Sequence, residues 1–246
     1  MAVRERPMTA SLDGRSALVT GGSRGIGLAT ARLLVDAGAR VLCLARPGRR
    51  LDEAVASLGE RAVAIGCNLS HGDDIDRAVD TVRQECDGAP DALVQGAGLF
   101  PLASFERTAP REFAETMQVN LLGPYRLAQP IVAAMRDRGS GHVVTIGSVA
   151  DRLALPENVA YAASKFGARA VHEVLREELR GTSVRVSLVS PGPVDTGIWD
   201  AIDPDSRPGF TPRARMLRPE SVAEAIMFVM TLPADVNIDE LRLSRA

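Results

Sequence analysis

The sequence predicts an α/β protein built on a doubly wound parallel sheet, and two observations carry this prediction. Seven short runs rich in valine and leucine recur along the chain, with helical patterns between them. These runs are almost continuously apolar, as expected of strands that are covered on both faces of a parallel sheet. We expect the seven strands at residues 17–20, 41–44, 62–65, 92–94, 143–146, 184–189 and 241–243. Ligands of such a sheet bind beyond the carboxyl ends of its strands.

Length and composition limit the domain count and the partners. A chain of 246 residues that is 46% hydrophobic can bury one sizeable core, so we expect one domain at 12–246 behind an N-terminal arm at 1–11. The net charge of −2, with both signs interleaved, argues against nucleic acid or an anionic membrane as a partner. The polar start lacks the apolar stretch of a leader and no run is long enough to span a membrane, which favours a soluble, cytoplasmic protein. The three cysteines lack the spacing of a metal site or redox pair.

The first strand is followed by a glycine-rich turn, TGGSRGIG at 20–27, which opens the first helix. Glycines at these positions allow a tight turn and let a pyrophosphate approach the helix N-terminus closely. The same residues also spell G-x-S-x-G, the nucleophile elbow of an α/β-hydrolase with Ser23 as nucleophile. That alternative needs a late histidine on a loop, whereas the last histidine, His172, falls inside the helical pattern at 168–180. We therefore favour nucleotide binding.

The end of the second strand indicates which nucleotide is bound. An acid about 20 residues after the glycines would bind a ribose 2′-hydroxyl, whereas an arginine suits a 2′-phosphate. Here the sequence has Ala45-Arg46, and Arg24, Arg49 and Arg50 add positive charge nearby. Guanidinium groups recognise phosphate well, so NADP(H) is favoured over NAD(H).

Two later segments depart from regular strand–helix alternation. Residues 108–138 read as one long helix that should be interrupted at Gly123-Pro124 and bent again at Pro130. Residues 193–218 are rich in proline and form a long loop, which we expect to serve as a substrate lid. The large apolar residues Trp199 and Phe210 lie in this segment and need burial.

Lys165 is the only lysine among 29 basic residues, and it stands four residues after Tyr161. Residues i and i+4 share one face of a helix, so the phenol and the ammonium group should project side by side. The adjacent cation favours the phenolate form, which a general base requires. A charge on a solvated helix face is the alternative interpretation of the lysine.

Taken together, these motifs resemble the classical short-chain dehydrogenase/reductase family from about Leu12 to the C-terminus. The resemblance rests on TGGSRGIG at 20–27, Asn120 in VNLLG, Ser148 in IGS, Tyr161 and Lys165 in YAASK, and PGPVDT at 191–196, which occur in the family's order and with its usual gap between Ser148 and Tyr161. It implies a Rossmann-type, seven-stranded single domain that assembles as a homo-oligomer, a tetramer or a dimer.

The resemblance also implies roles for individual residues. Tyr161 would exchange a proton with the substrate oxygen, Lys165 would assist it and hold the nicotinamide ribose, Ser148 would polarise the carbonyl, and Asn120 would help bind a relay water. No metal is required. The expected cofactor-binding residues are Gly21, Ser23, Arg24, Gly25, Ile26, Gly27, Arg46, Asn68, Leu69, Ala97, Gly98, Tyr161, Lys165, Pro191, Gly192, Val194 and Thr196.

Two positions depart from the family pattern. The family's Asn-Asn-Ala-Gly after the fourth strand is replaced by Gln95-Gly96-Ala97-Gly98, which loses two amides that brace the central sheet. The acid usually found after the third strand is replaced by Asn68, which carries no charge.

The function that follows is an NADP(H)-dependent oxidoreductase, or ketoreductase, that interconverts a ketone or aldehyde and an alcohol. A Rossmann-type nucleotide-binding or regulatory protein without turnover is the second hypothesis, and the hydrolase that uses Ser23 is the third. Besides Ser148, the expected substrate-contacting residues are mostly apolar, which suits a hydrophobic or cyclic ketone: Leu99, Phe100, Leu153, Val194 and Trp199.

Overall fold

A computed structural model describes residues 11–246, so the N-terminal arm expected at 1–11 lies outside the described residues except for Ser11. Within this range, seven parallel strands form one sheet in the order β3-β2-β1-β4-β5-β6-β7. The strands are β1 (Ser16–Thr20), β2 (Arg40–Ala45), β3 (Ala62–Gly66), β4 (Ala92–Gln95), β5 (Gly141–Ile146), β6 (Val184–Pro191) and β7 (Glu240–Leu243). The predicted fold class is confirmed, and each expected strand is present within a few residues of its predicted limits.

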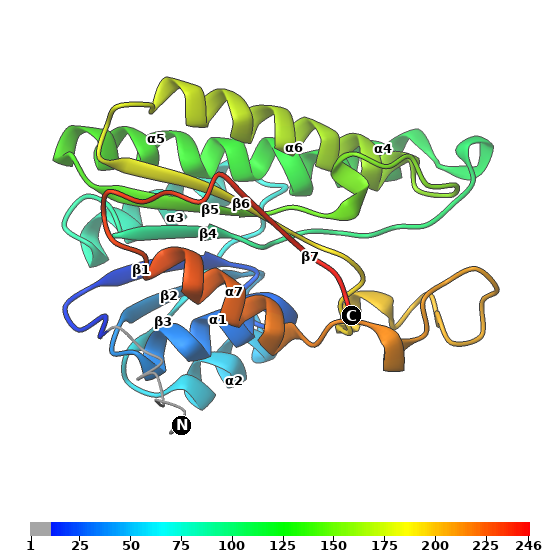
Figure 1. The fold of residues 1–246 in the computed structure, drawn as a ribbon, viewed down its shortest axis with the longest axis horizontal. Coiled ribbons are helices and arrows are strands. Elements are labelled where there is room, and N and C mark those ends of the chain that lie inside the picture. Colours follow the sequence, from blue (N-terminus) through cyan, green and yellow to red (C-terminus); the bar gives the residue numbers. More distant parts are fainter. Residues whose placement is uncertain (1–10) are drawn as a thin grey trace, which may run out of the picture.

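Helices cover both faces of the sheet (Figure 1). One face carries α1 (Gly25–Asp36), α2 (Arg49–Leu58) and α7 (Pro219–Met230), while the other carries α3 (Gly72–Glu85), α5 (Gly123–Arg138) and α6 (Val159–Glu178). Alternate strand residues enter the two cores: Leu18 packs on the α3–α5 side and Val19 on the α1–α7 side, both fully buried. This explains why the strands are apolar without interruption.

The strand order reverses between β1 and β4, which are neighbours in the sheet although β2 and β3 lie between them in the chain. Such a switch point opens a crevice at the carboxyl ends of the strands. The segment 193–218, with short helical turns at Gly197–Trp199 and Arg213–Arg215, lies at this end of the molecule (Figure 1). Fold topology therefore places the candidate lid beside the crevice.

The long helix expected at 108–138 is interrupted earlier than predicted. It consists of α4 (Pro110–Met117), a π-helical stretch (Gln118–Leu122) and α5, and Pro130 lies inside α5 without ending it. The irregular stretch therefore contains Asn120 rather than following it. Close packing explains why residue 123 is a glycine, because a Cβ atom there would lie 2.2 Å from the carbonyl oxygen of Leu69. Single π-helical turns inside helices occur frequently at functional sites.

No helix among residues 11–246 combines the length and the apolar character that crossing a membrane requires.

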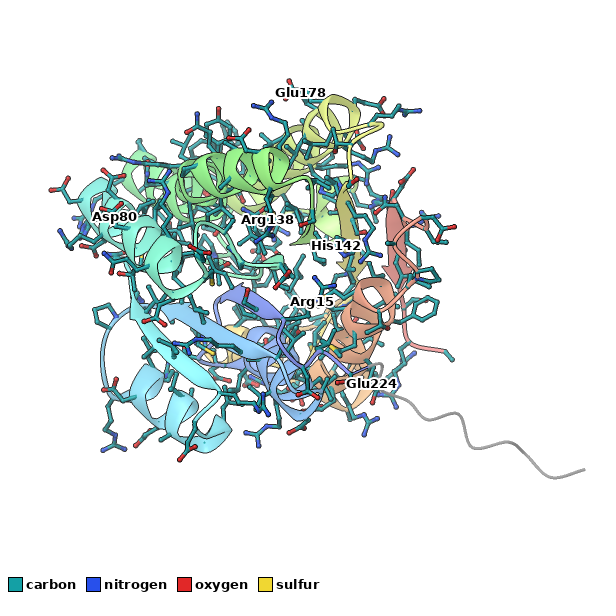
Figure 2. All side chains as sticks on the ribbon, turned by 90° about the vertical axis from the view of Figure 1, so that its left-hand side faces the viewer. Arg15, Asp80, Arg138, His142, Glu178 and Glu224 are labelled. Carbon is teal, nitrogen blue, oxygen red and sulfur yellow. The ribbon has the colours of Figure 1, made fainter. Side chains whose placement is uncertain are left out.

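His142 is buried at the end of the sheet where the strands begin, the side that faces the viewer in Figure 2. Its Nε2 atom lies 2.9 Å from the Ser187 hydroxyl. Burial, with a contribution from the nearby Arg185, lowers the pKa of His142 from 6.5 to about 3. The imidazole is therefore neutral in the folded protein, and its position at the opposite end of β5 separates it from the crevice.

This burial predicts acid sensitivity. Because the unfolded chain regains the ordinary histidine pKa, His142 contributes its full stability only above about pH 6.5 and loses it as the pH falls toward 3. Between pH 7 and pH 5 the loss should be about 2 kcal/mol in the free energy of unfolding. Urea unfolding at both pH values should show this loss in the wild type and a smaller one in His142→Gln. The exposed His71→Gln is the control, and an unchanged pH dependence in His142→Gln would contradict the assignment.

Candidate active site

The glycine-rich turn after β1 forms a cradle at the N-terminus of α1. Gly21 has φ of 73°, a left-handed conformation that favours glycine, and a Cβ atom on Gly27 would lie 2.3 Å from the carbonyl oxygen of Gly21. Arg24 precedes the helix, makes no side-chain capping bond, and no acidic residue occupies the first turn. The first N–H groups of α1 therefore remain available to an anion, as a pyrophosphate requires.

A groove of about 660 Å³ extends from this cradle along the ends of β2, β3 and β4. A second cavity, of about 180 Å³, adjoins it and shares Ile26, Gly96, Ala97, Gly98, Thr196 and Ile198 with it. Every residue expected to bind the cofactor lines one of these two spaces. The residues present fit a dinucleotide, because the glycine cradle and both spaces adjoin one another.

The groove has a positively charged end at α2. Arg24, Arg46 and Arg50 line it without an ion pair in the described chain, whereas Arg49 pairs with Glu53 at 2.9 Å. Burial, followed by the charges of Arg50 and Arg46, lowers the pKa of Arg24. A phosphate placed here would relieve this mutual repulsion.

The smaller cavity brings together three of the four predicted catalytic residues: Ser148, Tyr161 and Lys165. Ser148 follows β5, and its Oγ accepts a hydrogen bond from the Ala150 amide at 3.1 Å, so its hydroxyl proton remains available for another acceptor. Tyr161 and Lys165 come from successive turns of α6. The end of β5 and one face of α6 thus place these three side chains in a single cavity.

Lys165 connects α6 to the end of β5. Its Nζ donates to the carbonyl oxygen of Ile146 at 2.9 Å and lies 5.6 Å from the centre of the Tyr161 ring. Phe100 packs edge-on against the same ring, with 4.6 Å between ring centres. Lysine and tyrosine are therefore neighbours, as the sequence spacing predicts.

Asn120, the fourth predicted residue, lies behind this cavity in the π-helical stretch and is 5% exposed. Its Oδ1 accepts from the Leu99 amide at 2.7 Å, and its Nδ2 donates to the Leu99 carbonyl at 2.9 Å and to Ser164 Oγ at 3.0 Å. Ser164 in turn donates to the carbonyl oxygen of Tyr161. The carboxamide therefore fixes the chain after β4 and the first turns of α6 relative to each other.

The replacement of the family's paired asparagines does not leave the centre of the sheet without polar contacts. Gln95 Nε2 donates to the carbonyl oxygen of Pro124 at 3.1 Å, which ties β4 to α5. Thr20 Oγ1 accepts from the amides of Gly96 and Ala97. A Cβ atom at Gly96 would lie 2.9 Å from Ile146 Cδ1 and 3.0 Å from the carbonyl oxygen of Thr20, so this packing disfavours a side chain. Gln95 and Thr20 therefore brace the centre of the sheet in place of the two asparagine amides of the family pattern.

Only part of the expected substrate wall lines the cavity. Phe100, Val194 and Trp199 do so, and the Phe100 and Trp199 rings lie edge to face at 4.9 Å. Leu99 lines the larger groove, and Leu153 lines neither the groove nor the smaller cavity. Leu155 lines the smaller cavity instead. The polar residue Asn158 also lines it and is absent from the sequence prediction. The turn between β5 and α6 is irregular, so no periodic pattern could indicate which of its residues face inward.

The candidate lid makes ordered contacts around Arg213. This guanidinium donates to Asp195 at 2.8 Å and to Asp200 at 2.7 Å. Trp199 Nε1 donates to the carbonyl oxygen of Val194, and the Trp199 and Phe210 rings lie 6.3 Å apart. These contacts hold the tryptophan over the cavity.

A buried ionic network that sequence reasoning missed supports Ser148. Asp151 is 1% exposed, and it accepts hydrogen bonds from the Ser148 amide, the Ser190 hydroxyl and Arg152. Burial acts to raise the pKa of Asp151, but these hydrogen bonds outweigh it and lower the pKa. Arg152 also forms an ion pair with Glu240 on β7, with 2.5 Å between Nη1 and Oε1. The sequence signal for this network is the adjacent pair Asp151-Arg152 shortly after Ser148. Their partner Glu240 on β7 is distant in sequence, so the pair alone does not predict the network.

Fold and site together define a dinucleotide-binding oxidoreductase with a tyrosine–lysine–serine centre. Comparison with known proteins agrees with this class: the family profile described as short chain dehydrogenase matches residues 15–207. The chain belongs to the short-chain dehydrogenase/reductase family, whose enzymes act on CH–OH groups with an NAD(P) cofactor.

Individual relatives match over nearly the full chain. D-threitol dehydrogenase of Mycolicibacterium smegmatis is 34% identical over 93% of this chain and 92% of its own length. The 3-oxoacyl-[acyl-carrier-protein] reductase of Vibrio harveyi is 31% identical over 89% of this chain and 91% of its own. The structure of a metagenomic short-chain oxidoreductase in complex with NADP superposes with a TM-score of 0.82 at 31% identity, covering 96% of this chain and 99% of that chain.

The Asp151 network predicts a positioning role for this carboxylate. Asp151→Asn removes the buried charge and one of the two carboxylate oxygens, so the remaining oxygen cannot accept from Arg152 and from the Ser148 amide at the same time. The resulting displacement of Ser148 should lower kcat by about tenfold. The loss of a charge-assisted hydrogen bond should also lower the free energy of unfolding by about 2 kcal/mol, although Arg152 keeps Glu240. Steady-state kinetics and urea unfolding measure the two effects. Asp80→Asn, an exposed change on α3 (Figure 2), is the matched control. A folded Asp151→Asn enzyme with wild-type kcat would refute the positioning role.

Proposed function

We propose that the protein is an NADP(H)-dependent oxidoreductase that interconverts a ketone or aldehyde and the corresponding alcohol, with Tyr161 as the acid/base. The observation that carries the proposal is the convergence of Ser148, Tyr161 and Lys165 in one small cavity that continues into a nucleotide groove. A binding or regulatory protein has no need of this convergence. Burial of His172 inside α6, bonded to Thr145 Oγ1, also weakens the hydrolase alternative.

The residues divide the chemistry among them. When bound, the reduced nicotinamide supplies a hydride to the carbonyl carbon. The Tyr161 hydroxyl gives its proton to the carbonyl oxygen, so that one alcohol and one oxidised nucleotide result, and the reverse direction returns the proton to Tyr161. The Ser148 hydroxyl donates a hydrogen bond to the same oxygen, where negative charge develops. Lys165 stabilises the phenolate that remains and is positioned to hold the nucleotide ribose.

Tyr161 regains its proton by way of Lys165, from the side of the lysine that faces away from the substrate. A groove of about 590 Å³ between α5 and α6 is lined by both Asn120 and Lys165. Both Nδ2 protons of Asn120 are engaged, so a relay water would bind an oxygen of this residue, either Oδ1 or the main-chain carbonyl. This supports the proposed role of Asn120 in linking Lys165 to solvent.

Two further features complete the proposal. Residues 193–218 close over the bound substrate, so the fluorescence of Trp199, the sole tryptophan, should change on closure. The chain assembles as a homo-oligomer, a tetramer or a dimer, through apolar side chains exposed outside the groove between α5 and α6, among them Leu122 and Phe166. Light scattering that shows a monomer would exclude the assembly.

The nucleotide preference is tested at Arg46. Arg46→Ala should weaken NADPH binding about ten- to a hundredfold and leave NADH binding within a fewfold, because only the phosphorylated nucleotide loses a charge-assisted bond. Fluorescence titration with each nucleotide measures both constants. Arg83→Ala, which removes an exposed arginine on α3 outside the groove, is the control. Equal losses for NADPH and NADH would sink the assignment.

The catalytic assignment is tested at Lys165. Lys165→Arg keeps the charge and the helix propensity, but the planar guanidinium cannot serve the Ile146 carbonyl, the ribose and the phenolate from one compact centre. We expect kcat for NADPH-dependent ketone reduction to fall at least about a hundredfold in a folded protein. Arg83→Lys, an exposed exchange on α3, should have no effect. Near-normal turnover by Lys165→Arg would instead favour a lysine on a solvated helix face, and no turnover by the wild type would favour the nucleotide-binding protein without catalysis.

A further inference from the structure

Asn158 is a buried polar residue that the catalytic scheme leaves unused. It precedes α6, is 4% exposed, and lines the cavity that contains Ser148 and Tyr161. Its Oδ1 atom has no hydrogen-bond partner among the described residues. Buried carboxamide atoms are normally paired, so an unpaired one beside a cavity calls for an explanation.

Local structure does not supply that explanation. Asparagine at the start of a helix usually caps it through the side chain, but Asn158 makes no side-chain capping bond to α6. Its main chain is firmly held, because its carbonyl oxygen accepts from the Ala162 amide at 2.8 Å and its backbone forms a bridge with Ala103. The residue is thus fixed by its backbone while the carboxamide oxygen stays free.

The surroundings identify the kind of group that would pair with it. Three of the other polar side chains of the cavity act in the proposed chemistry, namely Ser148, Tyr161 and Lys165, and Thr196 is expected to bind the cofactor. The walls that remain are mainly apolar and include Phe100, Leu155 and Trp199. A carboxamide both donates and accepts, which matches a hydroxyl group. Among the lining residues of this cavity Lys165 is the sole cation, so a substrate carboxylate finds no free partner.

Position and size restrict where the hydroxyl can be. Asn158 directly precedes α6 and Tyr161 lies in its first turn, and both line the same cavity. A cavity of about 180 Å³ that must also admit the nicotinamide leaves room for a small molecule. A second polar group of the substrate that reaches Asn158 while the carbonyl reaches Tyr161 must therefore lie on a carbon near the reacting one.

We propose that Asn158 is a specificity residue that binds a hydroxyl group adjacent to the reacting carbonyl, so that the substrates are small, neutral α-hydroxy ketones and the corresponding vicinal diols. The inference rests on the proposed reductase function and names its substrate class. It replaces the hydrophobic ketone that the predicted apolar wall favours. Either end of the carboxamide serves, because rotation about its last bond exchanges oxygen and nitrogen.

The test compares ketones that differ by one hydroxyl group. Full-length protein is assayed with NADPH and two matched pairs, acetoin with butanone and α-hydroxycyclohexanone with cyclohexanone. The quantity compared is the ratio of kcat/KM for the hydroxy ketone to kcat/KM for the plain ketone. In at least one pair, the wild-type ratio should be on the order of ten to a hundred, because the plain ketone leaves the carboxamide unpaired.

Variants at Asn158 test whether the carboxamide is the cause of this ratio of kcat/KM values. Asn158→Leu keeps the branched shape of the side chain without its hydrogen bonding and should bring the ratio close to one, whereas Asn158→Ser, which retains a donor and an acceptor, should keep part of it. A purely structural role, such as support for α6, would lower both members of a pair together and preserve the ratio.

Each outcome decides a different point. A wild-type ratio near one in both pairs, or a ratio that Asn158→Leu leaves intact, overturns the role of Asn158 while ketone turnover still supports the reductase. Absence of turnover with every ketone and with both NADPH and NADH overturns the proposed function and this inference with it.

Discussion

The hydrogen bond from Lys165 to the carbonyl oxygen of Ile146 is the interaction on which the site depends, because it ties α6 to the carboxyl end of β5. The strand delivers Ser148, and the helix delivers Tyr161. Asn120 makes the complementary connection from the other side, since its carboxamide joins the chain after β4 to Ser164 on the same helix. Three parts of the chain that are distant in sequence are thereby locked around one cavity of about 180 Å³.

Charge is arranged around this cavity so that each part of the site has a distinct environment. The nucleotide groove carries Arg24, Arg46 and Arg50 without ion pairs in the described chain, which suits a phosphate. Beneath Ser148, by contrast, Asp151 and Arg152 are paired and linked to β7 through Glu240. Unpaired charge thus marks where a ligand is expected, and paired charge supports the backbone that positions the catalytic groups.

Sequence patterns predicted the sheet, the glycine cradle and the Tyr161–Lys165 pair, because each depends on local periodicity or on spacing within one element. They misplaced the helix interruption: the prolines indicate breaks at Gly123-Pro124 and Pro130, whereas the irregular stretch is Gln118–Leu122 and Pro130 lies inside α5. The Asp151 network and the inward position of Asn158 were also missed. Both depend on contacts between distant segments or on irregular turns, which local propensity does not encode.

If the proposed reaction is correct, hydride and proton reach the same carbonyl in the cavity shared by Ser148 and Tyr161. Turnover with NADPH that carries deuterium at the transferable nicotinamide position, followed by mass spectrometry of the alcohol formed from a panel of ketones and α-hydroxy ketones, tests this directly. We expect deuterium on the carbinol carbon in the wild type, and a loss of product in Tyr161→Phe with nucleotide binding retained. An alcohol without deuterium, or undiminished product from Tyr161→Phe, would contradict it.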